Sequence, residues 1–299
     1  MNPRRIAILF LTLLVSLAVG GDYPIETFSG GLATYSWTGQ GAALATPNEL
    51  YINPAGLALA TLSDFVATGS LPALDNHRVG CYGMNLIKPL RTETAGAVDT
   101  KTLGTLAASL HQFSGTPTSN NGRDYRPTQS LAAISFGTAM GDDTAFGLNL
   151  KVLTVDDGER ADSGFGIDLG FLYHPDNLRI GFSVSNLIPP GLSLNDERTI
   201  AKRLLRLGVG YELFGLWSLA VEGSYLTDAE ELDYGLYTAL TPLATTDLRL
   251  TLNGGYSISD EQWGAGLSLR VGLVEVGWAI ASQDESYGHS FRFAISPEF

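Results

Sequence analysis

The sequence predicts an all-β protein: a transmembrane antiparallel β-barrel of about 14 strands with an N-terminal plug (hatch) segment. Two observations predict this fold. From about residue 63 onward, segments of about ten residues alternate apolar and polar side chains, and Gly, Pro, Asp, Asn or Ser clusters separate them. The chain also has 35 Gly, 12 Tyr and 13 Phe but only 16% charged residues, against roughly 25% in soluble domains.

Residues 1–20 predict a secretory signal peptide. Arg4 and Arg5 give a positive start, and an apolar run of about fourteen residues ends in small residues before Gly20. An uncleaved membrane anchor is the alternative, but the run is shorter than the roughly 18–20 residues that span a bilayer. Export combined with membrane-spanning strands predicts that the protein lies in the cell outer membrane.

Residues 21–62 are rich in Gly and Ala and show no sustained period of two. Pro47 and Asn48 are expected to open a short helical turn, which Asn53-Pro54 would then end. A 14-stranded barrel leaves a lumen that is wide enough to need filling. We therefore expect residues 21–62 to form the hatch and residues 63–299 to form the barrel.

Each segment after residue 62 alternates with period two, which is typical of strands with one apolar face. In the segment 163–174, one face carries Phe165, Ile167, Leu169, Phe171 and Tyr173. The expected strands are 64–70, 77–87, 103–113, 128–139, 144–154, 163–174, 177–186, 204–213, 217–226, 232–241, 247–256, 263–271, 273–281 and 289–298.

The polar face of these strands is mostly Gly, Ser, Ala and Thr, whereas a soluble exterior would carry many Lys and Glu. The apolar face is therefore expected to meet lipid and the polar face to line a lumen. On this assignment, the charged side chains of the strand cores all face the lumen. They are Lys151, Asp168, Arg179, Arg206, Glu212, Glu222, Asp233, Arg249, Arg270, Glu275 and Arg292.

These inner charges are nearly balanced in sign, so neighbours can pair. A Lys or Arg that faced lipid at mid-membrane would cost roughly 2–4 kcal/mol. A structural network that braces the lumen is the main interpretation, and a solute path is the alternative.

The connections between the strands alternate in length, with short turns expected on the periplasmic side and longer loops outside. Residues 88–102 break this rule, because they form a long connection on the short-turn side. The longer loops are acidic. We interpret them as solvated surface, and a rim that binds divalent cations is the alternative.

The last strand is expected to place Phe291, Phe293, Ile295 and Phe299 on the lipid face. An apolar, alternating final strand that ends in Phe resembles the signal that barrel-insertion machinery reads. The expected partners are therefore outer-membrane lipids and the barrel-assembly machinery.

The stretch "YINPAGLA" carries a hatch motif made of Asn53, Pro54, Ala55, Gly56 and Leu57. It resembles the Asn-Pro-Ala-Gly-Leu stretch of the FadL/PorV superfamily of outer-membrane barrels. The strands at 147–153, 164–175 and 178–187 are similar to the PorV/PorQ branch, with matching Lys151, Asp168-Leu169-Gly170 and Asn186. "RLGVGYEL" at 206–213 also fits.

The resemblance implies a 14-stranded barrel with a plugged lumen, in which Asn53 and Pro54 fix the hatch turn and Gly56 allows close approach to the wall. FadL-like members pass fatty acids and aromatic hydrocarbons by diffusion and lateral exit. PorV-like members receive cargo in type IX secretion. The present chain departs from the FadL pattern, because no outer loop exceeds about sixteen residues.

The main functional expectation is a non-enzymatic PorV/PorQ-like accessory in protein secretion or surface assembly, with secretion-system components or secreted cargo as partners. The alternative is a FadL-like passive channel for small hydrophobic compounds such as fatty acids. A third possibility is a plugged barrel with no transport role.

Catalysis, metals, cofactors and nucleic acid are not expected. The net charge of −13 opposes binding to phosphate backbones. The four His residues are scattered over separate strands or strand ends, and the single Cys81 forms no paired-Cys spacing. No catalytic residue is therefore predicted.

Overall fold

The computed structural model describes residues 42–43, 45, 47, 50–71, 80–92, 101–114, 118–120, 123–125, 128–156, 160–194, 197–200, 203–227, 231–245, 247–258, 261, 263–283 and 286–296. The predicted signal peptide, residues 21–41 of the predicted hatch and Phe299 lie outside these residues.

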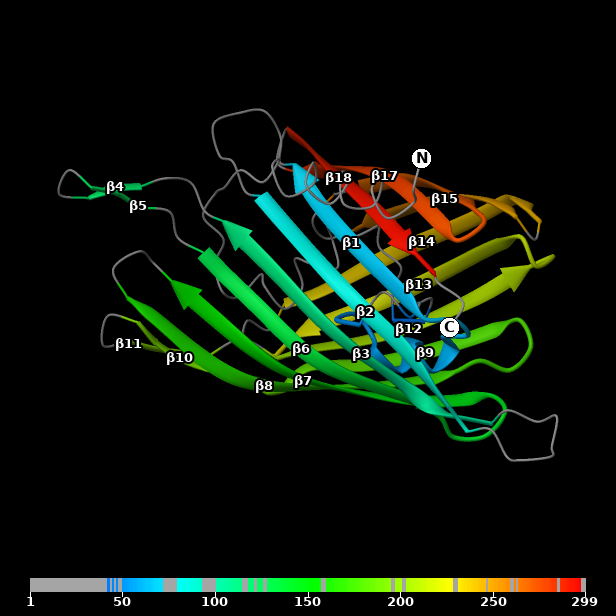
Figure 1. The fold of residues 1–299 in the computed structure, drawn as a ribbon, viewed down its shortest axis with the longest axis horizontal. Coiled ribbons are helices and arrows are strands. Elements are labelled where there is room, and N and C mark those ends of the chain that lie inside the picture. Colours follow the sequence, from blue (N-terminus) through cyan, green and yellow to red (C-terminus); the bar gives the residue numbers. More distant parts are fainter. Residues whose placement is uncertain are drawn as a thin grey trace.

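Within the described residues, fourteen antiparallel strands close into a barrel (Figure 1), which confirms the predicted fold class. They are β1 (Asp64–Leu71), β2 (Gly80–Thr92), β3 (Lys101–Ser114), β6 (Thr128–Ala139), β7 (Thr144–Asp156), β8 (Ala161–Tyr173), β9 (Leu178–Ile188), β12 (Leu204–Leu213), β13 (Trp217–Leu226), β14 (Glu231–Ala244), β15 (Leu248–Ser257), β16 (Trp263–Val271), β17 (Val274–Gln283) and β18 (Ser286–Ile295). Pairing of β1 with β18 closes the barrel, from Phe65 opposite Ile295 to Leu71 opposite His289.

Two small hairpins lie outside the barrel sheet. One is formed by β4 (Thr118–Asn120) with β5 (Arg123–Tyr125), and the other by β10 (Gly191–Leu194) with β11 (Glu197–Ile200). Both extend from one end of the barrel, at the left of Figure 1. The tight turns lie at the other end and include the β12–β13 and β16–β17 turns, where Gly215 and Gly272 take φ of 65° and 57°. These two ends are called the long-loop end and the short-turn end below.

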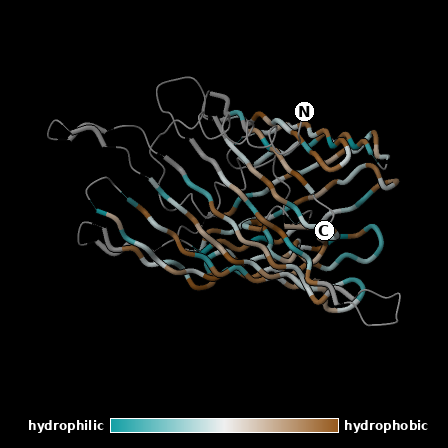
Figure 2. The backbone as a smooth tube through the Cα atoms, viewed as in Figure 1, coloured by the Kyte–Doolittle hydropathy of each residue, from teal (hydrophilic) through white to brown (hydrophobic). Residues whose placement is uncertain are grey.

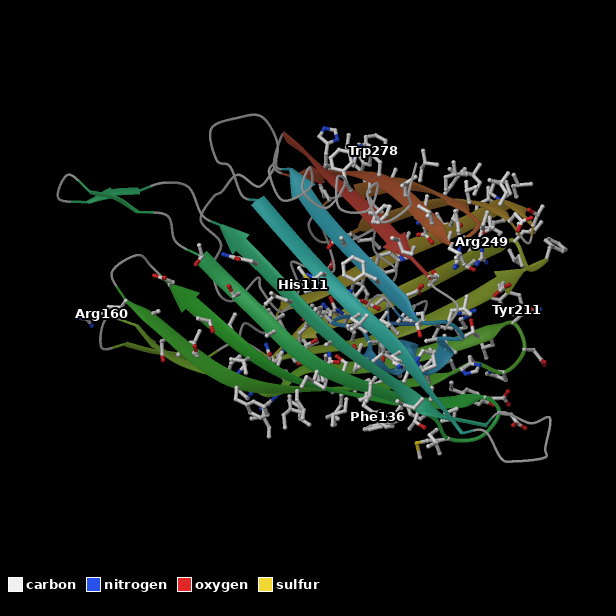
Figure 3. All side chains as sticks on the ribbon, in the orientation of Figure 1. His111, Phe136, Arg160, Tyr211, Arg249 and Trp278 are labelled. Atoms are coloured by element: carbon white, nitrogen blue, oxygen red, sulfur yellow. The ribbon has the colours of Figure 1, made fainter. Side chains whose placement is uncertain are left out.

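The outer face of the barrel is apolar and the inner face is small or polar. On β6, Ile134 is 63% exposed, whereas its neighbours Ala133 and Ser135 are 5% and 0% exposed. Figure 2 shows hydrophobic and more hydrophilic residues alternating along the strands, and in Figure 3 Phe136 and Trp278 point away from the barrel. This distribution is that of a transmembrane barrel, whose lipid-facing and lumen-facing residues alternate.

No helix in the described part of the chain is long and apolar enough to cross a membrane. The helix η1 (Pro54–Leu59) is a short 3-10 helix inside the barrel.

A turn at residues 50–52 stops before Asn53, and the Asn53-Pro54 pair then begins η1, a helix that the sequence did not predict. The Asn53 side chain caps the helix by accepting a hydrogen bond from the Ala55 backbone N–H at 3.1 Å. Pro54 occupies the first helical position, where its missing N–H costs nothing and its fixed φ suits the helix. The same dipeptide that disfavours a preceding helix therefore favours a following one.

The prediction that residues 88–102 form a long connection is wrong at both ends, because residues 88–92 and 101–102 belong to strands. β2 continues to Thr92 and β3 begins at Lys101, and these two residues are paired across the hairpin. A register shift between Leu90 and Arg91 accommodates the extension. The two strands satisfy each other's backbone groups beyond the expected strand ends, so only residues 93–100 connect them. Lys88, inside this extension, is exposed opposite Leu106 on the outer face.

Candidate functional site in the barrel lumen

The described part of the hatch packs against glycines on the inner face of the wall. A Cβ added at Gly147 on β7, Gly170 on β8 or Gly181 on β9 would overlap hatch atoms of residues 54–55, 53 and 42 respectively. A Cβ at Gly137 on β6 would lie 2.5 Å from Leu57 Cβ, and one at Gly208 on β12 would lie 3.2 Å from Ala43 Cβ.

These five glycines therefore form a seat for the hatch on five neighbouring strands, and only residues without a side chain allow so close an approach. The resemblance pointed to Gly56 for this role. Gly56 is buried within η1, and the close approaches described here come from glycines of the wall.

Asn53 forms hydrogen bonds both within the hatch and between the hatch and the barrel wall. Its side-chain amide donates to the carbonyl of Ala42 at 2.9 Å and to the carbonyl of Phe171 on β8 at 3.0 Å. Together with the cap to Ala55, all the polar atoms of this fully buried side chain are engaged. Loss of this side chain would leave buried backbone groups without partners.

Apolar contacts fix the other side of the hatch. Leu50 and Leu57 form a buried cluster with Ile87 on β2 and Ala107 on β3. Next to this cluster, the Tyr51 hydroxyl lies 2.5 Å from the Ser109 hydroxyl.

The Tyr51 ring also meets the ring of His111 edge-on, with the centroids 5.1 Å apart. His111 is in turn bonded through Nε2 to Asn85 Oδ1 at 2.9 Å. His111 on β3 is therefore one of the wall residues that contact the hatch, and it is not isolated on its strand.

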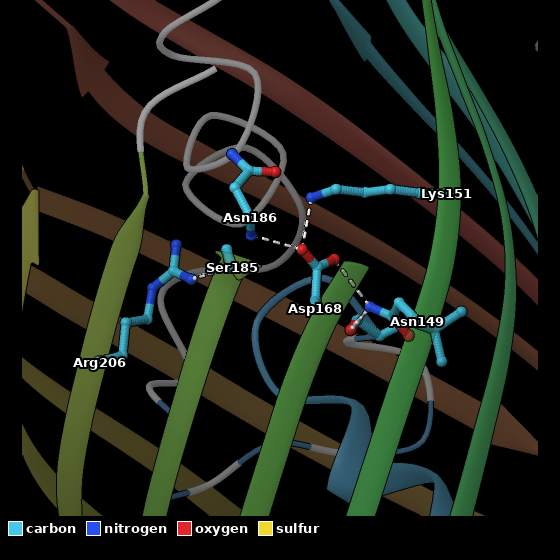
Figure 4. Close-up of polar contacts among 7 residues, drawn as sticks. Asn149, Lys151, Asp168, Ser185, Asn186 and Arg206 are labelled. Atoms are coloured by element: carbon cyan, nitrogen blue, oxygen red, sulfur yellow. Dashed lines mark hydrogen bonds and ion pairs between the residues drawn. The ribbon is translucent and has the colours of Figure 1, made fainter. Parts of the chain in front are cut away.

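Asp168 is the centre of a buried polar network (Figure 4) and is 2% exposed. Its carboxylate accepts hydrogen bonds from Lys151 Nζ at 2.6 Å, from the Asn186 backbone N–H at 2.7 Å and from Asn149 Nδ2 at 3.2 Å. Asn149 also donates to the carbonyl of Leu50 in the hatch at 2.8 Å. The network therefore connects three wall strands to the hatch.

A second charged pair lies on β12 and β13. Arg206 Nε is 3.7 Å from Glu222 Oε1, and Arg206 Nη1 donates to Ser185 Oγ at 3.2 Å. Glu222 Oε2 accepts a hydrogen bond from the backbone N–H of Ala42 in the hatch. Both buried ion pairs thus lie beside the hatch and reach its backbone through hydrogen bonds.

The strand ladder is interrupted where β9 passes Asp168. Ile167 pairs with Ile188 but Leu169 pairs with Val184, so residues 185–187 of β9 lie opposite one residue of β8. Asn186 takes a left-handed φ of 59° at this point.

Pairing of β9 with β12 also stops here, at Ser185 opposite Leu204. The chain after β9 turns across the inner face of β8, because a Cβ at Gly164 would lie 2.9 Å from Pro190 Cβ. Here the wall is held by side chains and loop backbone instead of a regular ladder.

A cavity of about 380 Å³ occupies the short-turn half of the lumen, and we call it the vestibule. Hatch residues, including Leu59 and Leu62, line one side of it. Its charged lining consists of Asp64, Arg179, Glu212, Arg249, Arg270, Glu275 and Arg292. Within it, Arg179 lies 3.4 Å from Glu212, and Arg292 lies 3.6 Å from Glu275.

The predicted lumen charges therefore fall into two groups. Lys151, Asp168, Arg206 and Glu222 surround the hatch, whereas Arg179, Glu212, Arg249, Arg270, Glu275 and Arg292 line the vestibule. The remaining one, Asp233 on β14, accepts a hydrogen bond from Ser257 Oγ on β15 at 3.0 Å. Sequence reasoning named Asn186 only as a match to the PorV/PorQ branch, and it missed Asn149 and the role of the glycine seat. Asn149 could have been found from its inner-face position on β7, but no sequence signal indicates which glycines touch the hatch.

The structure describes three of the four residues of the proposed assembly signal. Phe293 lies opposite Val276 on β17, on the outer face, and is 5% exposed, while Phe291 and Ile295 are half-buried. Phe299 lies outside the described residues, so its role stays a prediction. Among the described residues, no group of three or more His, Cys, Asp or Glu could hold a metal ion.

Comparison with solved structures shows the same fold over nearly the whole chain. The toluene transporter TbuX of Ralstonia pickettii aligns with a TM-score of 0.57 at 12% identity, covering 92% of this chain and 98% of that one. The P. putida toluene transporter TodX aligns at 0.58 and 12%, covering 93% and 99%. A Pseudomonas aeruginosa FadL homologue aligns at 0.56 and 11%, covering 94% and 98%.

The fold is therefore that of the FadL-type outer-membrane barrels, and at these identities the likeness shows the fold alone. By sequence, a family model described as "F plasmid transfer operon, TraF, protein" matches residues 128–269, from β6 into β16. No curated protein matches the chain in sequence. None of these matches supports the PorV/PorQ branch, and the structural neighbours are transport channels, not enzymes.

Proposed function

We propose that this protein is a non-enzymatic, passive channel of the outer membrane for small hydrophobic compounds such as fatty acids or alkylbenzenes. The observation that carries the proposal is the interrupted ladder between β8 and β9, directly beside the hatch. A regular ladder would seal the wall with backbone hydrogen bonds. Here residues 185–187 leave it, and a segment held by fewer backbone hydrogen bonds opens at lower cost.

The residues around the interruption suit an apolar solute. Leu187, Ile188 and Phe165 are 39%, 49% and 52% exposed, and Leu192 is buried just beyond them. The exposed apolar side chains lie on the lipid side of the interruption, so a hydrophobic molecule that passed the polar network around Asp168 would meet them on its way into the bilayer. The full-length likeness to two toluene transporters and a FadL homologue supports the proposed class of solute.

The secretion-accessory hypothesis is not carried forward, because none of the comparisons favours it. The plugged barrel with no transport role is the outcome to be excluded by experiment.

Uptake must be measured across an intact outer membrane, since apolar compounds cross simple lipid bilayers unaided. The chain would be expressed in a Gram-negative host that lacks its own fatty-acid channel, and entry of labelled toluene and oleate would be followed. We expect several-fold faster entry than in cells with the empty vector. Equal rates, with folded barrel verified by its shifted migration on unheated gels, would contradict the proposal.

The route is tested with disulfides in a Cys81→Ser background. Ile167→Cys with Ile188→Cys joins register partners at the interruption, and antiparallel partners lie within disulfide reach. Leu169→Cys with Val184→Cys is the matched control, because it joins the same strands where they already pair. Oxidation should slow uptake in the first variant, reversibly with reductant, and leave the control unchanged.

A further inference from the structure

The vestibule carries a charge imbalance that the proposed channel does not use. Its lining has four arginines and three acidic residues, an excess of one positive charge in a chain whose net charge is −13. Arg179 is paired with Glu212 and Arg292 with Glu275. Arg249 and Arg270 remain, and no ion pair to either is found among the described residues.

Arg249 and Arg270 are direct partners across the β15–β16 ladder. Side chains in this relation have Cβ atoms about 4.5–5.5 Å apart, and like charges there are destabilising. Elsewhere in the same cavity, charged side chains of opposite sign form ion pairs, as Arg179 does with Glu212. A lumen braced only for stability would not need two guanidinium groups side by side.

The side chains of both arginines line the cavity. Arg270 Nε donates to the carbonyl of Gly272 at 3.3 Å, which holds its side chain along the wall. Each guanidinium has five N–H donors in a planar fork, and this fork matches the oxygens of a carboxylate or phosphate. Ser268 and Thr251 line the cavity between the neighbouring strands and add neutral hydroxyl groups.

We propose that Arg249 and Arg270 form a binding site in the vestibule for the oxyanion group of a small molecule, a carboxylate or a phosphate. The volume of about 380 Å³ falls in the range of small-molecule sites. A bound oxyanion would offset the repulsion between the two like charges, so the ladder is least strained when the site is filled. The site goes beyond the proposed channel function, because it requires binding and no transport.

The experiment titrates the purified, folded full-length protein in zwitterionic detergent with three probes: butanoate, inorganic phosphate and neutral butanamide. Calorimetry at low salt should show saturable binding of at least one anion and none of butanamide. Binding of both anions indicates that the oxyanion alone is recognised, whereas binding of butanoate alone indicates an organic carboxylate. Added salt should weaken the binding, since the vestibule is open to solvent on one side.

Variants locate the site. R249Q with R270Q should weaken anion binding at least tenfold, and the two corresponding Lys substitutions should restore part of it through charge. Ser218→Ala, on β13 in the same cavity but away from the two arginines, should change it less than threefold. The single variant Arg249→Gln, at an exposed position, provides the test if the double variant does not fold.

Three results would overturn the proposal: no saturable binding of either anion by the unmodified protein, equal binding of butanamide and butanoate, or unchanged affinity in folded R249Q. Uptake of toluene is measured on the same variants. The channel proposal predicts that uptake is retained, so failure of one proposal does not imply failure of the other.

Discussion

The two halves of the barrel wall meet different surroundings, although both are built on the same alternating pattern. On the side formed by β6 to β9, inner residues such as Ser135, Asn149 and Ser183 are at most 1% exposed, because the hatch covers them. On the side formed by β15 to β17, inner residues such as Ser268, Arg270 and Glu275 are only half-buried around the vestibule. The described part of the hatch therefore fills one side of the lumen, and the vestibule lies on the other side.

Side-chain size follows this division. The hatch side offers glycines and short polar groups that let a second layer of backbone approach, while the vestibule side carries long charged side chains that need room. The comparison shows that the inner face of one barrel serves as a packing surface in one region and as a solvated binding surface in another.

The largest expected effect is the loss of one member of a buried ion pair on the hatch side. Lys151→Met leaves Asp168 charged and buried, which typically costs 3–5 kcal/mol. The matched change on the vestibule side is Glu212→Gln, whose partner Arg179 is 30% exposed and can be reached by water. We expect about 1 kcal/mol or less there. Urea unfolding in detergent, followed by the gel shift of the folded barrel, measures both, and equal effects would contradict the division.

A side chain in the glycine seat should have the next largest effect. Gly147→Val places methyl groups into the backbone of Pro54 and Ala55, and overpacking of this kind costs about 1–3 kcal/mol. Ser268→Val adds similar volume beside the vestibule and should cost under about 1 kcal/mol. Limited proteolysis of the hatch, together with the unfolding midpoint, would show whether Gly147→Val displaces the hatch or only destabilises it.

Asn53→Ala should loosen the hatch at a cost comparable with that of Gly147→Val. It removes the cap of η1 and two hydrogen bonds, each worth roughly 1 kcal/mol. We expect more frequent current bursts in planar bilayers than for the unmodified protein. Ser268→Ala is the control on the vestibule side. A silent trace for Asn53→Ala would mean that apolar contacts alone retain the hatch.

The smallest effect is expected when the hatch is tethered to the wall. Ala43→Cys with Gly208→Cys, in the Cys81→Ser background, joins positions whose Cβ atoms would lie 3.2 Å apart, close to the separation in a disulfide. If solutes leave through the interruption beside β9, oxidation should suppress current bursts and reduce uptake of toluene by less than twofold. Abolished uptake would indicate that the hatch must move for passage.

The sequence alone predicted the barrel, its fourteen strands and the inner face of the charged residues in the predicted strand cores, because period-two alternation is local and leaves only one face suitable for lipid. It also predicted a hatch from composition and resemblance. These inferences need no knowledge of which strands contact which residues of the hatch.

Only the tertiary structure decided how the lumen is divided. The direction of η1 from Asn53, the extension of β2 and β3, the departure of β9 beside Asp168 and the glycine seat all depend on contacts between residues distant in the chain. Alternation assigns each residue to a face but not to a neighbour. Lys151 and Arg249 therefore look alike in the sequence, and only the position of the hatch makes one a buried structural charge and the other part of a solvated cavity.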